Sequence, residues 1–139
     1  MDAALRIVRM IRVALMASVV LYALIGEVVG RGATSEPDTT LYFVVTFLAI
    51  ADVGVIVVMR RQLVVPAETA LAKQPQDATA LNRWRAGYIV IYGLSETVAL
   101  FGLVLRFLGF SFSHVATFYA VGLILMMFFG PRRPSNELG

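Results

Sequence analysis

Apolar residues gather in four long stretches along this chain, separated by polar segments. The stretches cover residues 13–30, 41–59, 87–105 and 114–130, and each approaches the roughly 20 residues that a helix needs to cross about 30 Å of hydrocarbon. The second stretch is rich in Val, Ile and Phe, but inside a bilayer a helix satisfies its own backbone hydrogen bonds, so we predict a helix there too. The pattern predicts an all-α fold with a single membrane domain over residues 1–139, a four-transmembrane-helix bundle of two antiparallel hairpins.

The polar connection at residues 62–85 has helical signals of its own. The run from Ala67 to Lys73 contains good helix formers and ends just before Pro75. Asp77 is placed as the N-cap of a helix that continues through Trp84 into the third apolar stretch. We therefore predict a helical hairpin loop whose tip lies near Pro75.

Composition agrees with a membrane protein and excludes several kinds of chemistry. Hydrophobic residues make up 59% of the 139-residue chain, and the mean hydropathy is +0.80, which is typical of an integral membrane protein. The chain has no cysteine and one histidine, His114, so thiol catalysis and multi-histidine metal or haem sites are excluded. The sequence has no phosphate-binding loop, cofactor motif or paired nucleophile and base, so we expect neither an enzyme nor a bound cofactor.

The basic residues predict how the spans are oriented. Ten of the twelve lie before the first stretch, between the second and third, or after the fourth: Arg6, Arg9, Arg12, Arg60, Arg61, Lys73, Arg83, Arg85, Arg132 and Arg133. The positive-inside rule assigns these segments, with both termini and the 62–85 hairpin, to the cytoplasm. We expect a multi-pass protein of the cell inner membrane, surrounded by membrane lipid. Because the basic residues flank apolar spans, we expect no nucleic-acid binding.

Glu96 lies in the middle of the third apolar stretch. A carboxylate at the centre of a membrane-spanning helix costs roughly 2.5 to 3.5 kcal/mol on insertion scales, so it needs a proton, a partner or a function. Asp52 is predicted at a similar depth, about 10 Å from the inner end of its span against about 14 Å for Glu96. Both carboxylates are also nearly equidistant in sequence from Pro75. We therefore expect them to be neighbours across an antiparallel pair of helices.

Such a pair has two interpretations. Two carboxyl groups in a low dielectric cannot easily both ionise, so they would share a proton, or coordinate a small cation together with the hydroxyls of Ser95 and Thr97. The alternative is that Glu96 is protonated or hydrogen-bonded between helices and serves only to hold them together. A third acid, Glu27, is four residues from Arg31, and an i,i+4 ion pair at the outer interface is its simplest interpretation.

Small residues in the third stretch favour close contacts between helices. Gly87, Gly93 and Gly102 lie along it, and glycine lets the backbones of membrane helices approach one another. Four short spans also enclose little interior. We therefore expect a homo-oligomer or a hetero-complex with other membrane subunits.

Two segments of the chain carry a family resemblance. They are Ala67-Glu68-Thr69-Ala70-Leu71-Ala72-Lys73-Gln74-Pro75 and Ser95-Glu96-Thr97-Val98-Ala99-Leu100-Phe101-Gly102-Leu103-Val104-Leu105. Together they resemble the proteolipid subunit c of rotary ATP synthases, in its cytoplasmic loop and its carboxylate-bearing helix. The resemblance covers residues 67–105 and implies that Glu96 carries H⁺ or Na⁺. It also implies that Lys73, Gln74 and Pro75 form the loop that contacts a rotor stalk.

Two functions are therefore expected, one leading and one alternative. The leading expectation is a small integral membrane protein that binds or translocates H⁺ or Na⁺ through Glu96, assisted by Asp52. The alternative is a non-catalytic structural or accessory subunit of a larger membrane protein complex.

Overall fold

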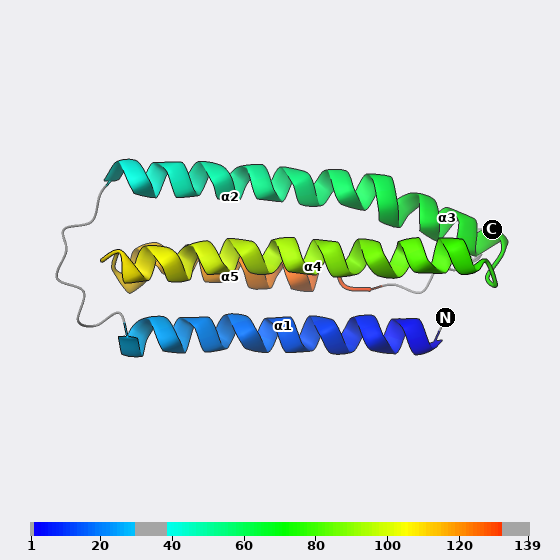
Figure 1. Ribbon diagram of the computed structural model, residues 1–139, viewed down its shortest axis with the longest axis horizontal. Helices are drawn as coiled ribbons and strands as arrows, with labels where there is room; N and C mark the ends of the chain where they lie inside the picture. Colours follow the sequence, from blue (N-terminus) through cyan, green and yellow to red (C-terminus); the bar gives the residue numbers. More distant parts are fainter. Residues whose placement is uncertain (1, 30–38, 132–139) are drawn as a thin grey trace.

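The structure of the protein is a computed structural model that describes residues 2–29 and 39–131. Four long helices lie side by side (Figure 1): α1 (Asp2–Val29), α2 (Thr39–Met59), α4 (Ala78–Phe107) and α5 (Phe112–Phe128). A π-helical turn, η2 (Arg60–Val64), and a short helix, α3 (Val65–Lys73), prolong α2. The described residues contain no strand, so the expected all-α fold is confirmed.

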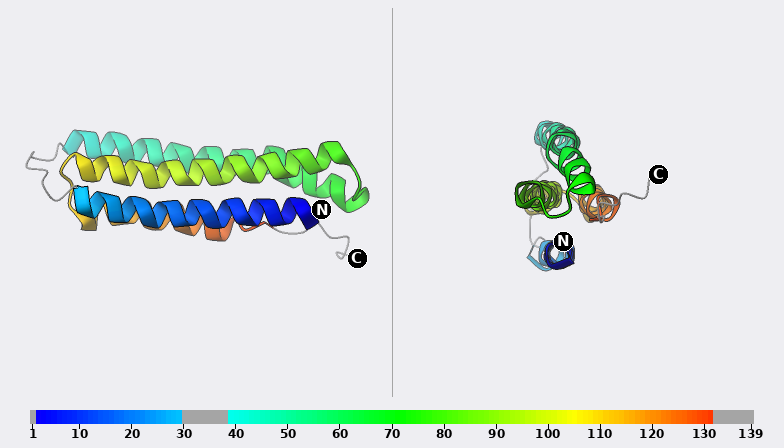
Figure 2. Two further views of the ribbon diagram at one scale, coloured as in Figure 1. Left: turned by 60° about the horizontal axis from the view of Figure 1, so that its bottom comes forward. Right: turned by 90° about the vertical axis from the view of Figure 1, so that its right-hand side faces the viewer.

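Helix α4 is at the centre of the bundle, and α1, α2, α3 and α5 all pack on it. Seen end-on, α1 and α2 lie on opposite sides of α4 and α5 (Figure 2). Helices α4 and α5 run antiparallel, because Gly102 lies against Phe118 while the Tyr92 hydroxyl donates to the Phe129 carbonyl oxygen further along. The predicted first hairpin, α1 with α2, is not seen as a packed pair, since α1 packs on α4 and α5 instead.

Three helical segments are long and apolar enough to cross a membrane: Asp2–Val29, Thr39–Lys73 and Ala78–Phe107. Helix α5 is apolar but has 17 residues, which is about 25 Å at 1.5 Å per residue. Helix α1 begins at Asp2, well before the predicted start of the first span near residue 13. The reason is that hydropathy measures apolarity, whereas arginine is a good helix former and lets a helix continue beyond the hydrocarbon.

The connection at residues 62–85 is formed by two helical arms and a short turn. Asp77 is the N-cap of α4, as predicted: its Oδ1 accepts from the backbone N–H groups of Thr79 at 3.0 Å and Ala80 at 3.2 Å. The Asp77 N–H in turn donates to the Gln74 carbonyl oxygen at 3.1 Å and closes the turn. The turn contains Pro75, so the predicted position of the tip is confirmed.

The glycines of the third apolar stretch mostly serve contacts within the chain. A Cβ atom added at Gly87 would lie 2.7 Å from Val64 Cγ2, and one added at Gly102 would lie 2.8 Å from Phe118 Cβ. At Gly93 the same added atom has nothing within 4 Å. The close approaches at Gly87 and Gly102 are therefore explained by η2 and α5, without an oligomer.

Candidate functional site

Glu96 is hydrogen-bonded to a tyrosine of another helix. The Tyr22 hydroxyl of α1 donates to Glu96 Oε1 at 2.6 Å. Glu96 is half-buried, and its face of α4 also carries Tyr92 and Tyr88 at four-residue intervals. Within the part of the chain that the structure describes, no lysine or arginine forms a salt bridge with Glu96. Among the described residues, the carboxylate therefore has a hydrogen-bond donor but no counter-ion.

A second polar contact joins the same two helices nearer their C-terminal ends. Arg106 Nε donates to Glu27 Oε1 at 3.1 Å, and Arg106 Nη1 donates to the Phe110 carbonyl oxygen at 2.9 Å. Since Tyr22 pairs with Glu96 and Glu27 with Arg106, α1 and α4 run parallel. Glu27 thus has a cross-helix partner in Arg106, whereas the expected pair with Arg31 lies outside the described residues.

A buried tyrosine hydroxyl lies beside this ion pair. Tyr119 Oη of α5 is buried and has no hydrogen-bond partner among the described residues. A Cβ added at Gly26 of α1 would lie 3.1 Å from Tyr119 Oη and 3.3 Å from Arg106 Cγ. The side chains of α4 and α5 thus converge on Gly26 between Glu96 and the ends of the helices.

The two hydroxyls predicted to assist Glu96 are bonded to their own helix. Ser95 Oγ donates to the Ile91 carbonyl oxygen at 2.8 Å, and Thr97 Oγ1 donates to the Gly93 carbonyl oxygen at 3.0 Å. Among the described residues no group of three His, Cys, Asp or Glu side chains is placed to hold a metal ion. These two side chains therefore show no arrangement around a cation at Glu96.

Asp52 is not brought together with Glu96. It lies on the face of α2 that carries the buried residues Ala49 and Ile56, and this face packs toward α4. Glu96 is turned instead toward Tyr22 of α1, and α1 and α2 lie on opposite sides of α4 (Figure 2). Asp52 Oδ2 is buried and has no hydrogen-bond partner among the described residues, so Asp52 is a separate polar position in the bundle.

The residues predicted to contact a soluble partner lie at the tip of the hairpin. Lys73, Gln74 and Pro75 are all exposed, as is the following Gln76. They are at the end of the bundle where α1 begins (Figure 1). Their position leaves them accessible to a partner.

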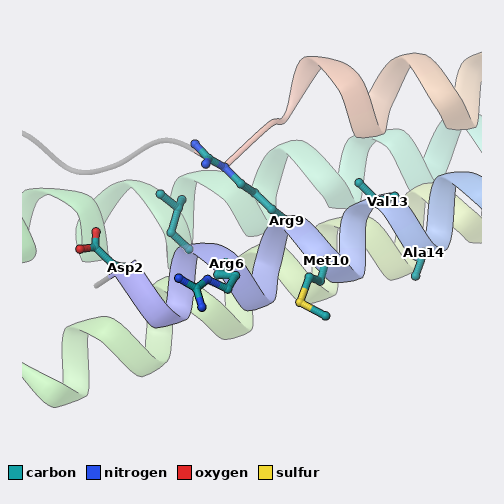
Figure 3. Close-up of a pocket in the computed structure, with 7 residues that line it drawn as sticks. Asp2, Arg6, Arg9, Met10, Val13 and Ala14 are labelled. Atoms are coloured by element: carbon teal, nitrogen blue, oxygen red, sulfur yellow. The ribbon is translucent and has the colours of Figure 1, made fainter.

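A shallow groove lies along the first half of α1 (Figure 3). It is lined by two basic residues, Arg6 and Arg9, and by the apolar residues Met10 and Val13. Tyr22 is nine residues beyond Val13, which is about 14 Å along the helix. The groove is therefore not part of the Glu96 site.

Sequence reasoning missed three residues of this site: Tyr22, Arg106 as the partner of Glu27, and Tyr119. A usable signal was present for the tyrosines. Tyrosine prefers the membrane–water interface, where its hydroxyl is hydrated, so a tyrosine deep in an apolar stretch requires a buried hydrogen-bond partner. Tyr22 meets that condition, and its partner is Glu96.

Comparison with protein-family models, with curated proteins and with solved structures finds no match to this chain. The resemblance to ATP-synthase subunit c over residues 67–105 rests on those residues alone. Function is therefore argued from the polar contacts between α1, α4 and α5.

Proposed function

We propose that the chain is a proton-binding membrane protein in which Glu96 takes up and releases the proton. The 2.6 Å hydrogen bond from Tyr22 to Glu96 carries this proposal, because both residues lie on helices long enough to span a membrane. An ionised carboxylate at mid-membrane is costly without a counter-ion. A protonated carboxyl group needs only hydrogen bonds, and Tyr22 supplies one. Reversible protonation is therefore the chemistry that this site supports best.

Protons suit the site better than sodium ions. A bound cation of that size needs several oxygen ligands around it. Glu96 and Tyr22 offer one carboxylate and one hydroxyl, whereas Ser95 and Thr97 donate to their own helix and Asp52 faces α4 from the other side. A single carboxyl oxygen is enough to bind a proton.

We propose that the four long helices all cross the cell inner membrane, with the 62–85 hairpin and both ends of the chain in the cytoplasm. The alternating helix directions in Figure 1 and the ten basic residues assigned to one side support this topology. Because the chain has no cysteine, single cysteines report accessibility cleanly. An impermeant maleimide should label Gln76→Cys only from the cytoplasmic side and Ser113→Cys only from the opposite side.

The resemblance to subunit c supports a partner for the hairpin tip. In that family the corresponding loop contacts a soluble rotor stalk, and here Lys73, Gln74 and Pro75 are exposed at the end of the bundle. We propose that the tip contacts a cytoplasmic protein and that the chain works in a homo-oligomer or a hetero-complex of membrane subunits. Gly93, which has open space beside it, is on a surface free for such contacts.

The second candidate is a structural or accessory subunit without transport. The observation that favours it is that the Tyr22–Glu96 and Glu27–Arg106 contacts both join α1 to α4. Interhelical hydrogen bonds of this kind stabilise membrane bundles without further chemistry. In that case Glu96→Gln, which retains an acceptor for Tyr22, should preserve both assembly and function.

Carbodiimide labelling in native membranes tests proton binding. A hydrophobic carbodiimide reacts with protonated carboxyl groups in an apolar environment. We expect Glu96 to be labelled at neutral pH, with labelling that falls as pH rises. Glu96→Gln should remove the adduct, whereas Asp52→Asn should keep it.

Mass mapping of the adduct separates the candidates. Unlabelled Glu96 at every pH would contradict proton binding and favour the accessory role. Labelling that falls when sodium is added at constant pH would show that the site takes Na⁺. Proton flux through liposomes containing the wild type or Glu96→Gln then distinguishes binding from translocation.

A further inference from the structure

The first half of α1 presents basic residues and then apolar residues on its exposed surface. Arg6 and Arg9 are exposed, and Met10 and Val13 are each 65% exposed. All four line the groove of Figure 3, which has a volume of about 640 Å³. Their spacing of three and four positions keeps them on one face of the helix. The groove therefore combines cationic and apolar side chains along a single face.

Distances along α1 place the two arginines at the level of the lipid headgroups. Helix α1 is long enough to cross a membrane, and Glu27 near its other end belongs to a partly exposed ion pair. Arg9 is 18 residues and Arg6 is 21 residues before Glu27, which is about 27 Å and 32 Å at 1.5 Å per residue. The hydrocarbon core of a bilayer is about 30 Å thick. With Glu27 at one membrane surface, the arginines therefore reach the other, and Met10 and Val13 lie just inside the hydrocarbon.

The guanidinium groups of Arg6 and Arg9 form no salt bridge or hydrogen bond with the residues that the structure describes. Arg12, which follows one turn later, is used within the bundle, since its Nη1 would lie 2.9 Å from a Cβ added at Gly130. Asp2 is the only acidic residue among the first 26, so three arginines outnumber one carboxylate at this end of α1. This excess of positive charge complements an anionic ligand at the membrane surface.

A phospholipid matches this groove better than a free anion does. A phosphate group accepts hydrogen bonds from the planar donor fork of arginine, and the guanidinium groups of Arg6 and Arg9 point to different sides of the groove (Figure 3). They are thus placed to approach one phosphate from two sides. The acyl chains of a lipid continue into the hydrocarbon, where Met10 and Val13 supply an apolar surface. A free phosphate would leave that apolar surface unused.

We propose that the groove on α1 binds an anionic phospholipid from the leaflet that faces the hairpin tip. Arg6 and Arg9 bind the phosphate, and Met10 and Val13 contact an acyl chain. A zwitterionic phospholipid carries the same phosphate but also a cation that the arginines repel, so the site prefers a lipid with net negative charge. The proposal requires that α1 cross the membrane, and it does not depend on proton binding by Glu96.

Lipid binding to the full chain tests the site. The protein, purified in detergent, is titrated with phosphatidylglycerol or with phosphatidylcholine of the same acyl chains, and bound lipids are counted by native mass spectrometry. We expect the wild type to bind one phosphatidylglycerol more tightly than phosphatidylcholine. Arg6→Gln and Arg9→Gln should each weaken phosphatidylglycerol binding about fivefold, the contribution expected of one basic residue beside an anionic lipid surface.

Arg83→Gln is the matched control. Arg83 is exposed on α4, near the end of the bundle where α1 begins (Figure 1), and it does not line the groove. Its substitution removes the same charge and should leave phosphatidylglycerol binding unchanged. If the glutamine variants fold poorly, the double variant Arg6→Lys with Arg9→Lys keeps both charges and should retain the preference for phosphatidylglycerol over phosphatidylcholine.

Three results would overturn the lipid site. They are equal binding of the two lipids to the wild type, an equal loss of binding in Arg83→Gln, and displacement of phosphatidylglycerol by inorganic phosphate at the same concentration, which would indicate a site for a free anion. Carbodiimide labelling of Glu96 should be unchanged in Arg6→Gln and Arg9→Gln. Failure of the lipid site and failure of proton binding are therefore seen in separate measurements.

Discussion

The contact between α4 and α5 at Gly102 gives the sharpest prediction about stability. A Cβ atom added at Gly102 would lie 2.8 Å from Phe118 Cβ, 3.2 Å from Tyr119 Cε1 and 3.2 Å from the Val115 carbonyl oxygen. The first and last of these neighbours are attached rigidly to the backbone of α5. Gly102→Ala therefore requires the two helices to separate by several tenths of an ångström, and overpacking of this kind costs about 1 to 3 kcal/mol.

Gly93→Ala is the matched control, because the same added atom has nothing within 4 Å there. Both substitutions bring the same gain in helix propensity, at most about 1 kcal/mol, so this gain cancels in the comparison. Unfolding of both variants by SDS in mixed micelles should show Gly102→Ala less stable than Gly93→Ala by about 1 to 3 kcal/mol. Equal unfolding midpoints would refute the close α4–α5 contact.

Three further substitutions test individual contacts by the same unfolding assay. Tyr22→Phe removes the hydrogen bond to Glu96 and should lower stability by about 0.6 to 1.7 kcal/mol, the range found for interhelical hydrogen bonds in membranes; no loss would show that the bond contributes nothing. Arg106→Gln should cost about 1 kcal/mol, a modest value because the Glu27 side chain is 35% exposed, and adding Glu27→Gln should recover part of it. Asp77→Ala should cost about 1 kcal/mol through loss of the cap, seen as faster amide exchange in the first turn of α4, and unchanged exchange would count against the cap.

The sequence pattern predicted the helices well because their signals are local. Asp77 supplies a cap that acts on its own first turn, and the turn at Pro75 follows from residues within a few positions of it. The pattern did not predict that α4 is central. Inside a bilayer the lipid-facing and protein-facing sides of a helix are both apolar, so nothing in the apolar stretches distinguishes the face that packs on α1 from the face that meets lipid.

The lack of a sequence signal for helix packing also explains which residues of the candidate site could be predicted and which could not. Glu96 could be identified from the sequence because the free-energy cost of a charged side chain in a membrane depends on its depth. That depth follows directly from the position of the residue along its helix. Tyr22 and Arg106 were missed because their roles depend on which helix lies beside α4. Long-range contacts between α1 and α4 join residues more than 70 positions apart, and no local signal encodes them.

Asp52 and Glu96 show that similar depth in the membrane does not determine whether two side chains meet. Two side chains at the same depth meet only if both helices are rotated so that the residues face each other, and each residue turns the direction by about 100°. Asp52 faces α4 from α2, but Glu96 is turned toward α1 by its bond to Tyr22. The proposed protonation of Glu96 should therefore depend on its contact with Tyr22 of α1, and Asp52→Asn should leave carbodiimide labelling of Glu96 unchanged.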